Sequence, residues 1–279
     1  MSFSLVPGFA QRYPKVDDDL LIESCCTSLD EARWAETRGA NRIELCTDLS
    51  VGGLTPPRDL IREVVQALTI PVNVLIRPSS RESGAGGIAA RKHATLGAVR
   101  GRGPCAAWEG SSGARRFGRQ CQSASRDEGR EGLGFTAADF VYDEAALEQM
   151  IDDIGYCKAV GVSGIVVGAL TEEGAIDLPA MRRLVEAARP LPVTFHRAFD
   201  VCTDDPFTAL DQIIALGCTR LLTSGRATSA WEGRNLIALL VRRAGTRLSV
   251  MPGAGIKREK TAALADATAA VEFHGTAIP

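Results

Sequence analysis

Cysteine and glutamate recur with the same spacing at two places early in the chain. Glu23 precedes Cys25 by two residues, and Glu44 precedes Cys46 by two, each at the end of a short apolar run typical of a β-strand. Because side chains alternate across a strand, each glutamate shares a face with its cysteine. Neighbouring strands lie about 4.8 Å apart, so thiols from two strand ends could meet around one ion. Thiolate ligands without several histidines favour Cu(I), with zinc second.

Cys26 directly follows Cys25, so these two side chains diverge across the strand. We expect only one of them to face the ion while the other packs behind it. The predicted metal ligands are therefore Cys25, Cys26 and Cys46. The alternative is that these are buried, unreactive thiols that act as small hydrophobic residues.

Ionisable side chains also follow other predicted strands, and they leave an enzyme as an alternative. Glu23 and Glu44 with His196 could perform acid–base chemistry, since different surroundings separate the pKa values of two carboxylates. Arg77 and Arg197 could hold an anionic substrate. The candidate catalytic residues are Glu23, Glu44, Arg77, His196, Arg197 and Asp200. A salt-bridge network of the two glutamates and two arginines is the purely structural alternative.

Glycines after the last two predicted strands lie where many barrel enzymes bind phosphate with backbone amides. The candidates are Gly253, Gly255 and Gly275, although glycine also serves simply to turn the chain. No lysine lies at the end of a predicted strand, which disfavours a Schiff-base aldolase. The enzyme alternative is therefore a lyase or isomerase acting on a small phosphorylated or carboxylate metabolite.

Short β-rich runs alternate with amphipathic helical stretches along most of the chain. Strands are predicted at Leu20–Ser24, Asn41–Leu45, Pro71–Ile76, Gly164–Val167, Pro192–Phe195, Arg220–Thr223, Leu248–Met251 and Ala270–Phe273. Helices are predicted at Leu29–Arg38, Arg58–Leu68, Glu144–Val160, Pro179–Ala188, Pro206–Leu216, Asn235–Ala244 and Arg258–Ala267. Parallel units of this kind favour an α/β fold, a closed (β/α)8 TIM barrel whose function sits at the carboxyl ends of the strands. No Gly-x-Gly-x-x-Gly follows the first strand, which disfavours an open doubly wound sheet.

Two stretches fall outside this alternation. Residues 79–138 are rich in Gly, Arg, Ser and Ala, so we expect a disordered low-complexity insert after the third strand. The abrupt change of composition suggests translated intron sequence, and recruitment of a partner by the insert is a third functional alternative. Residues 1–19 are expected to form a flexible tail, which leaves 20–78 and 139–279 as a single barrel domain. The chain stops six residues after the last predicted strand, so we expect the eighth helix to be missing. The apolar outer surface of the first and last strands is then either covered by a partner or exposed, which would compromise the fold.

The charge balance and the hydropathy pattern limit the partners. The 279 residues include 32 Lys and Arg against 34 Asp and Glu, a formal net charge of −2. This argues against nucleic acid as the main partner, because phosphate binding needs a basic surface. No apolar run reaches the roughly 18 residues of a membrane span, and no signal-peptide stretch is present. We therefore expect a cytoplasmic protein with no membrane partner, and we expect its eight cysteines to be free thiols.

Seven stretches carry a resemblance to a known family, and the Phe-His-Arg-Ala-Phe-Asp string at residues 195–200 is highly specific. The stretches are Leu21–Cys26, Arg42–Cys46, Gly52–Pro56, Ile76–Pro78, Val193–Asp200, Leu222–Gly225 and Pro252–Ile256. Together they resemble the CutC copper homeostasis family. The resemblance implies a cytoplasmic (β/α)8 barrel that binds Cu(I) through Cys46 and either Cys25 or Cys26, acts in copper tolerance and forms homo-oligomers. Arg226 departs from the family pattern, which has a second glycine there, and we expect it to crowd the loop.

Overall fold

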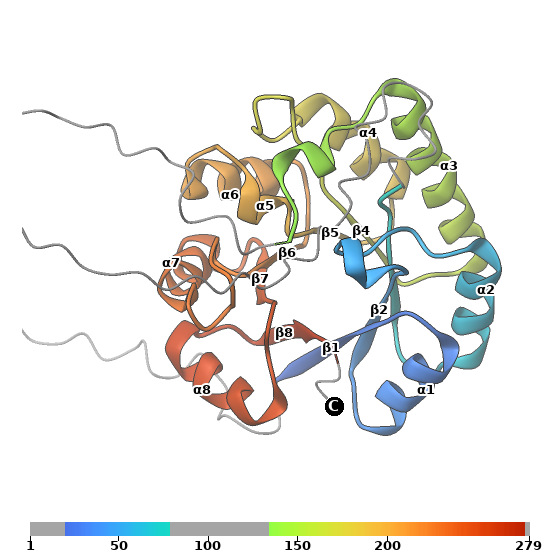
Figure 1. The fold of residues 1–279 in the computed structure, drawn as a ribbon, viewed down its shortest axis with the longest axis horizontal. Helices are drawn as coiled ribbons and strands as arrows, with labels where there is room; N and C mark the ends of the chain where they lie inside the picture. The colour runs from blue at the N-terminus through green and yellow to red at the C-terminus, as the bar shows by residue number, and fades with distance from the viewer. Residues whose placement is uncertain (1–19, 79–133, 277–279) are drawn as a thin grey trace, which may run out of the picture.

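Eight parallel strands form the centre of the molecule. The computed structural model describes residues 20–78 and 134–276. The strands are β1 (Leu21–Cys26), β2 (Arg42–Leu45), β3 (Val72–Leu75), β4 (Gly164–Val167), β5 (Val193–Phe195), β6 (Arg220–Thr223), β7 (Ser249–Pro252) and β8 (Glu272–Gly275). They pair in the order β7-β6-β5-β4-β3-β2-β1-β8, and a parallel bridge between Gly253 and His274 joins the two ends. The sheet therefore closes into the predicted TIM barrel (Figure 1).

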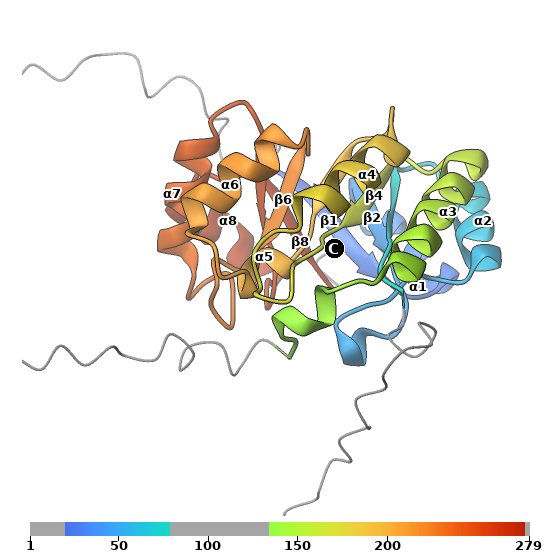
Figure 2. The same cartoon turned by 90° about the horizontal axis from the view of Figure 1, so that it is seen from above.

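The helices form an outer layer around the strands, as Figures 1 and 2 show. They are α1 (Leu29–Thr37), α2 (Arg58–Ala67), α3 (Glu144–Val160), α4 (Leu178–Ala188), α5 (Ala198–Val201), α6 (Pro206–Ala215), α7 (Arg234–Ala244) and α8 (Arg258–Thr268). All seven predicted helices are confirmed to within a residue or two at each end. Helix α5 was not predicted, because four residues are too few to produce a helical hydrophobic period. Two 3-10 turns, η1 (Leu49–Val51) and η2 (Ala137–Phe140), complete the described elements.

Side-chain caps explain where several of these helices begin. The Ser28 hydroxyl accepts a hydrogen bond from the Glu31 amide at the start of α1. Asp143, Asp177 and Asp205 accept first-turn amides of α3, α4 and α6 in the same way. Such caps satisfy amides that have no partner inside the helix, and each stabilises its helix by about 1 kcal/mol. The caps therefore fix the helix starts next to the ends of the strands.

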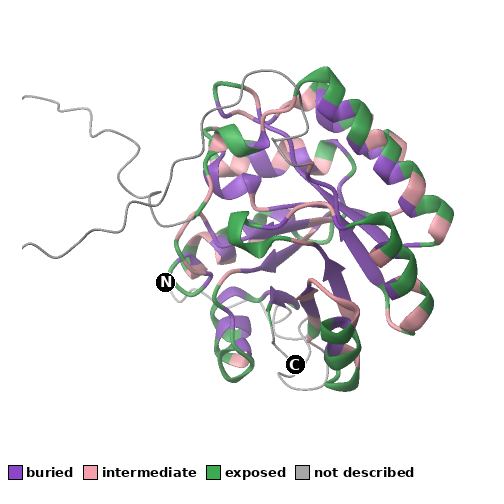
Figure 3. Cartoon of the chain, turned by 45° about the vertical axis from the view of Figure 1, so that its right-hand side comes forward, coloured by how far each residue is buried: buried purple, intermediate pink, exposed green. Residues whose placement is uncertain are grey.

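The strand register decides which side chains point into the barrel. Glu23 on β1 lies beside Arg42 on β2 and His274 on β8, and Cys25 lies beside Glu44. Because alternate residues of a strand share a face, all five point to the same side of the sheet. Residues of the opposite side join the large apolar core between strands and helices. The strands are buried almost throughout (Figure 3). The interior of the barrel is thus partly polar, whereas the layer outside the strands is apolar.

The predicted tail, residues 1–19, and most of the predicted insert, residues 79–133, lie outside the described residues. The chain is described again from Gly134, earlier than the predicted domain boundary at residue 139. Thr136 donates its amide to the Asp139 carboxylate at 2.7 Å and so begins η2. Phe135 packs edge-on against Phe140, with 5.4 Å between ring centroids. Residues 134–138 therefore pack as part of the barrel domain.

Two further expectations concern surfaces and membranes. Within residues 20–78 and 134–276, no helix is long and apolar enough to cross a bilayer. No helix follows β8 in the same ranges. Leu21, at the start of β1, and Val271, just before β8, are among the exposed apolar side chains. A partner that covers this surface stays a prediction.

Candidate functional site

A pair of thiols lies at the carboxyl ends of β1 and β2. The Cys25 and Cys46 sulfurs are 3.4 Å apart. Cys46 is buried, Cys25 is partly buried, and both pack with Leu75 and Val166 in a small apolar cluster. Cys26 lies on the other face of β1, where its thiol donates to the Ser24 carbonyl and packs in the strand–helix core. The expectation that only one of the adjacent cysteines faces inward is confirmed, and that residue is Cys25.

The surroundings of Cys25 and Cys26 raise the pKa of both thiols. The hydrogen bond with Cys46, burial and the nearby Glu44 carboxylate together raise the pKa of Cys25 well above its ordinary value. Burial raises the pKa of Cys26 to about 12. A thiol with a raised pKa is a poor nucleophile, but a bound cation can displace its proton. The arrangement therefore suits metal coordination better than covalent catalysis.

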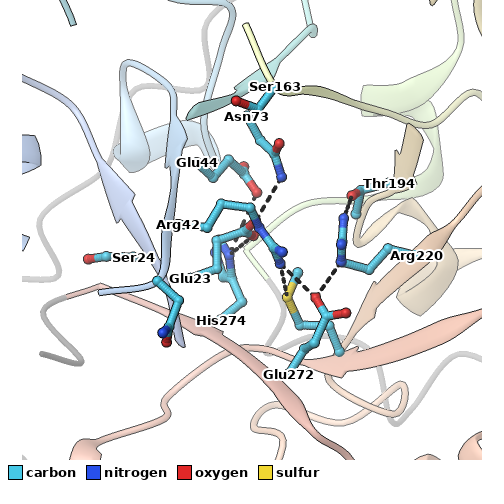
Figure 4. A network of polar contacts seen from close by, with 12 residues as sticks. Glu23, Ser24, Arg42, Glu44, Asn73, Ser163, Thr194, Arg220, Glu272 and His274 are labelled. Atoms are coloured by element: carbon cyan, nitrogen blue, oxygen red, sulfur yellow. Dashed lines mark hydrogen bonds and ion pairs between the residues drawn. The ribbon is translucent and has the colours of Figure 1, made fainter. Parts of the chain in front are cut away.

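A histidine from the last strand joins the two glutamates of the first two strands (Figure 4). His274 Nδ1 lies 2.9 Å from Glu23 Oε1 and 3.6 Å from Glu44 Oε2. Glu23 Oε2 also accepts hydrogen bonds from Arg42 at 2.5 Å and from Asn73 at 2.9 Å. Burial alone would raise the pKa of Glu23, but His274 and Arg42 outweigh it and lower the pKa to about 2. Glu23 is thus an ionised carboxylate, and both of its oxygens have hydrogen-bond partners.

Glu44 differs from Glu23 in its contacts. Its Oε2 is buried and has no hydrogen-bond partner among the described residues. Burial raises the pKa of Glu44 to about 7, with Glu23 adding to the shift and His274 and Arg42 opposing it. For His274, burial alone would lower the pKa, but Glu44 and Glu23 outweigh it and raise the pKa above its ordinary value. The site therefore contains one satisfied carboxylate and one with unused hydrogen-bonding capacity.

Ligand atoms of Cys25, Glu44 and His274 all lie within 4.8 Å of one another. A thiol, a carboxylate and an imidazole are all common metal ligands in proteins. The second thiol, Cys46, touches the first at 3.4 Å. The residues present therefore fit a thiophilic metal ion, and the sulfur pair fits the predicted Cu(I).

Three residues of this site received no role from the sequence, namely Arg42, Asn73 and His274. Arg42 and Asn73 lie in the first half of their strands, whereas the predicted site residues lie at or after the strand ends. Strand alternation places Arg42 on the same face as Glu44, and the register of β2 and β3 pairs Asn73 with Glu44. His274 follows the last predicted strand, yet its contact with Glu23 spans 251 positions of the sequence. Only closure of the barrel brings the two together.

Arg77, a candidate catalytic residue, holds a loop in place. Its Nη1 donates to the carbonyls of Val51 at 2.7 Å and Gly53 at 2.8 Å. Its guanidinium lies over the Phe140 ring, 4.9 Å from the centroid. Gly53 in turn lies so close to Cys46 that a Cβ there would stand 3.8 Å from the sulfur and 2.9 Å from Leu75. Arg77 therefore fixes the β2–α2 loop over the thiol pair.

Arg197 and Asp200 form a second anchored group after β5. Arg197 Nε donates to Asp200 at 2.9 Å, and its guanidinium lies over the Phe135 ring. Asp200 is fully buried and also accepts hydrogen bonds from Thr223 and Ser224. These contacts order the loop after β6. Neither residue hydrogen-bonds Glu23 or Glu44 in the described part of the chain, so a catalytic role for either stays a prediction.

Arg226 fits the loop after β6 despite its departure from the family pattern. It has a φ of +60°, in the left-handed region that favours glycine. Its amide donates to Asp200 at 3.2 Å, its Nη1 donates to the Asp204 carbonyl at 2.8 Å, and its guanidinium lies over Phe199. These contacts offset the backbone strain, which is about 1–2 kcal/mol for a residue with a Cβ.

His196 lies apart from the two glutamates. Its Nδ1 accepts the Ala198 amide at 3.2 Å, and its ring packs against Phe140 and Phe195. Burial, together with Arg77 and Arg197, lowers the pKa of His196 to about 3, so the ring is neutral. Among the described residues it has no hydrogen bond to Glu23 or Glu44. The sequence predicted His196 as the histidine beside the two glutamates. In the structure that histidine is His274.

Two of the three glycines predicted to bind phosphate take part in strand pairing. The Gly253 amide donates to the Thr223 carbonyl at 2.9 Å, and Gly253 forms the bridge that closes the barrel. Gly275 pairs with Ser24 of β1. Gly255 has a φ of +67°, which a residue with a side chain rarely adopts. Binding of an anion at these glycines stays a prediction.

Known proteins are similar to this chain in sequence and in fold. The model of the CutC family matches residues 20–83 and 135–279. The family protein CutC of Parabacteroides distasonis is 39% identical over 259 residues, which cover 92% of this chain and 82% of the relative. A solved structure named as a copper homeostasis protein CutC, from Streptococcus agalactiae, has a TM-score of 0.69 and 28% identity, and the match covers 93% of this chain and 100% of that chain. The solved structure of QR15, an aldolase, matches 94% of this chain and 91% of its own with a TM-score of 0.55 and 10% identity, which shows the barrel fold alone. Because the family model and the curated relative both match most of its length, this chain belongs to the CutC family.

Proposed function

We propose that this protein acts in copper homeostasis by binding Cu(I) through Cys25 and Cys46. The contact of 3.4 Å between the two sulfurs is the observation that carries the proposal. Soft thiolate ligands without several histidines favour Cu(I), with zinc second. The name of the Streptococcus agalactiae relative, a copper homeostasis protein, supports the same assignment.

The residues around the thiol pair have separate tasks in this proposal. Cys25 and Cys46 supply the ligands, and both must lose their protons when the ion binds. Burial by Leu75, Val166 and the loop that Arg77 holds keeps water and oxidants away from the bound ion. Cys26 faces the opposite side of β1 and supplies no ligand. Since the pKa of Cys25 is raised, Cu(I) affinity should increase with pH across the neutral range.

A competition titration with a chromophoric Cu(I) chelator tests this proposal on the reduced full-length protein. We expect one tightly bound Cu(I) in the wild type and its loss in Cys25→Ser and Cys46→Ser. Cys26→Ser and Cys218→Ser are matched controls, because both are buried cysteines outside the pair, and they should keep the ion. Full stoichiometry in both Cys25→Ser and Cys46→Ser would overturn the proposal.

Acid–base catalysis on a small anionic metabolite is the second candidate function. Two carboxylates that both contact His274 Nδ1 and have pKa values of about 2 and about 7 are the observation that favours it. A thermal-shift screen of phosphorylated and carboxylate metabolites tests it, and Glu44→Gln should abolish the effect of any compound that stabilises the wild type. The cytoplasmic location and the homo-oligomer stay predictions beside both functions.

A further inference from the structure

The distance between the two sulfurs limits how an ion can sit between them. Ligands on opposite sides of one ion are separated by two bond lengths, about 4.6 Å for metal–sulfur bonds of about 2.3 Å. The Cys25 and Cys46 sulfurs are only 3.4 Å apart. In a tetrahedral site with the same bonds, two sulfurs stand about 3.8 Å apart. The observed separation is closer to the tetrahedral arrangement, which requires further ligands.

Two further donors lie beside the thiol pair. A carboxylate oxygen of Glu44 and a ring nitrogen of His274 lie within 4.8 Å of the Cys25 sulfur and of each other. Glu44 Oε2 is buried and has no hydrogen-bond partner in the described part of the chain. Its nearest charged contact is His274 Nδ1 at 3.6 Å, which is beyond hydrogen-bond distance. A buried carboxylate oxygen without a hydrogen bond carries a free-energy cost that a cation would remove, so this oxygen points independently to a ligand.

The Glu23 carboxylate sets the orientation of His274 through its contact with Nδ1. Glu23 contacts His274 Nδ1 at 2.9 Å and is itself fixed by Arg42 and Asn73. Metal-binding histidines in proteins usually have such an outer carboxylate, which orients the ring and increases its basicity (Figure 4). The ring position is therefore determined before any ion arrives.

We propose that Glu44 and His274 complete the ligand set, so that the site also binds a divalent ion of the zinc class through Cys25, Cys46, Glu44 and His274. This inference rests on the thiol pair of the proposed function and adds two ligands and a second class of metal to it. Mixed sulfur, nitrogen and oxygen donors are typical of zinc, whereas Cu(I) is selected by sulfur. The two metals would then compete for one site.

An anaerobic Co²⁺ titration of the reduced full-length protein tests this ligand set, because tetrahedral Co²⁺ reports its ligands by absorption. We expect a thiolate-to-cobalt charge-transfer band and intense d–d bands in the wild type. Glu44→Gln and His274→Asn should each weaken Co²⁺ binding about 10-fold or more. His196→Asn is the matched control, since it changes another buried barrel histidine, and it should bind Co²⁺ like the wild type.

The outcomes separate this inference from the proposed function. Loss of Cu(I) in Cys46→Ser together with unchanged Co²⁺ affinity in both Glu44→Gln and His274→Asn would overturn the four-ligand site and leave the thiol site intact. Retention of Cu(I) in Cys46→Ser would overturn the thiol site itself. If a variant does not fold, X-ray absorption of the zinc-loaded wild type decides the question: sulfur with nitrogen or oxygen in the first shell supports the proposal, and sulfur alone contradicts it.

Discussion

Glu23 and Glu44 are the same residue type, lie on neighbouring strands and face the same barrel interior, yet their acid strengths differ widely. Glu23 has three hydrogen-bonding neighbours, two of which carry or can carry positive charge. Among the described residues, Glu44 Oε2 has no hydrogen bond, and its ion-pair contact with His274 is longer, at 3.6 Å. Burial raises the pKa of both, and only Glu23 has enough partners to reverse the effect. At neutral pH the site thus holds one ionised carboxylate, Glu23, and one carboxyl group, Glu44, whose pKa is near neutrality.

Replacement of Glu44 by Gln should flatten the pH dependence of stability. The pKa of Glu44 is raised from about 4.5 to about 7, so between these values the native state binds more protons than the unfolded state. Wild-type stability should therefore fall as pH rises through this window, by about 2–3 kcal/mol in total. Glu44→Gln cannot titrate, so urea unfolding at pH 5 and pH 8 should show it gaining on the wild type at the higher pH.

Glu23→Gln is the contrasting control for this measurement. The pKa of Glu23 is lowered to about 2, so its contribution to stability is present above about pH 4.5 and is lost only as pH falls toward 2. The variant should be destabilised at pH 7 by about 3–5 kcal/mol, because the buried charge of Arg42 loses a partner. Parallel pH profiles for the two variants would contradict the different acid strengths.

At the scale of elements, the strands and helices are predicted from the sequence more accurately than the loop contacts are. Alternation within each strand predicted that Glu23 shares a face with Cys25 and that Glu44 shares a face with Cys46, since a strand has a fixed period of two. It left open whether Cys25 or Cys26 lies beside Cys46. The role of Arg77 could not be predicted, because its partners are carbonyls of the β2–α2 loop, and a loop has no periodic signal. His274 could not be matched to Glu23 either, because the predicted barrel closure places the last strand beside the first but does not give the register between them.

Arg77→Gln should loosen the loop that covers the thiol pair. The shorter side chain cannot keep both hydrogen bonds to Val51 and Gly53, nor the stacking on Phe140. We expect the free energy of unfolding to fall by about 1–3 kcal/mol and Cys46 to react faster with a thiol reagent. Mass spectrometry after timed alkylation measures this, with Cys218 as the internal reference because it is buried far from the loop in sequence. Equal acceleration at both cysteines would indicate general unfolding and contradict the specific role of Arg77.

At the scale of the whole molecule, an ion-pair network inside the barrel connects strands β2, β6 and β8. Glu272 on β8 accepts hydrogen bonds from Arg42 on β2 at 2.7 Å and from Arg220 on β6 at 2.5 Å (Figure 4). Strands β2 and β6 occupy opposite positions in an eight-stranded ring. Arg42 also contacts Glu23, so the network connects these strands to the candidate metal site. A change at Glu272 should therefore affect the whole barrel and the position of Glu23 together.

Glu272→Gln should destabilise the protein far more than the loss of an exposed ion pair. The side chains of Glu272, Arg42 and Arg220 are only 9%, 13% and 14% exposed, so the variant leaves two arginines buried with less compensation. Removing one partner of a buried charge network costs about 3–5 kcal/mol. Glu186→Gln is the matched control, because Glu186 pairs with Arg189 on the surface, where both side chains are about 70% exposed and such pairs contribute little. Urea unfolding at pH 7 measures both variants. A similar, small loss of unfolding free energy in both variants would mean that the interior ion-pair network does not stabilise the barrel. The apolar layer between strands and helices would then hold the barrel closed without it.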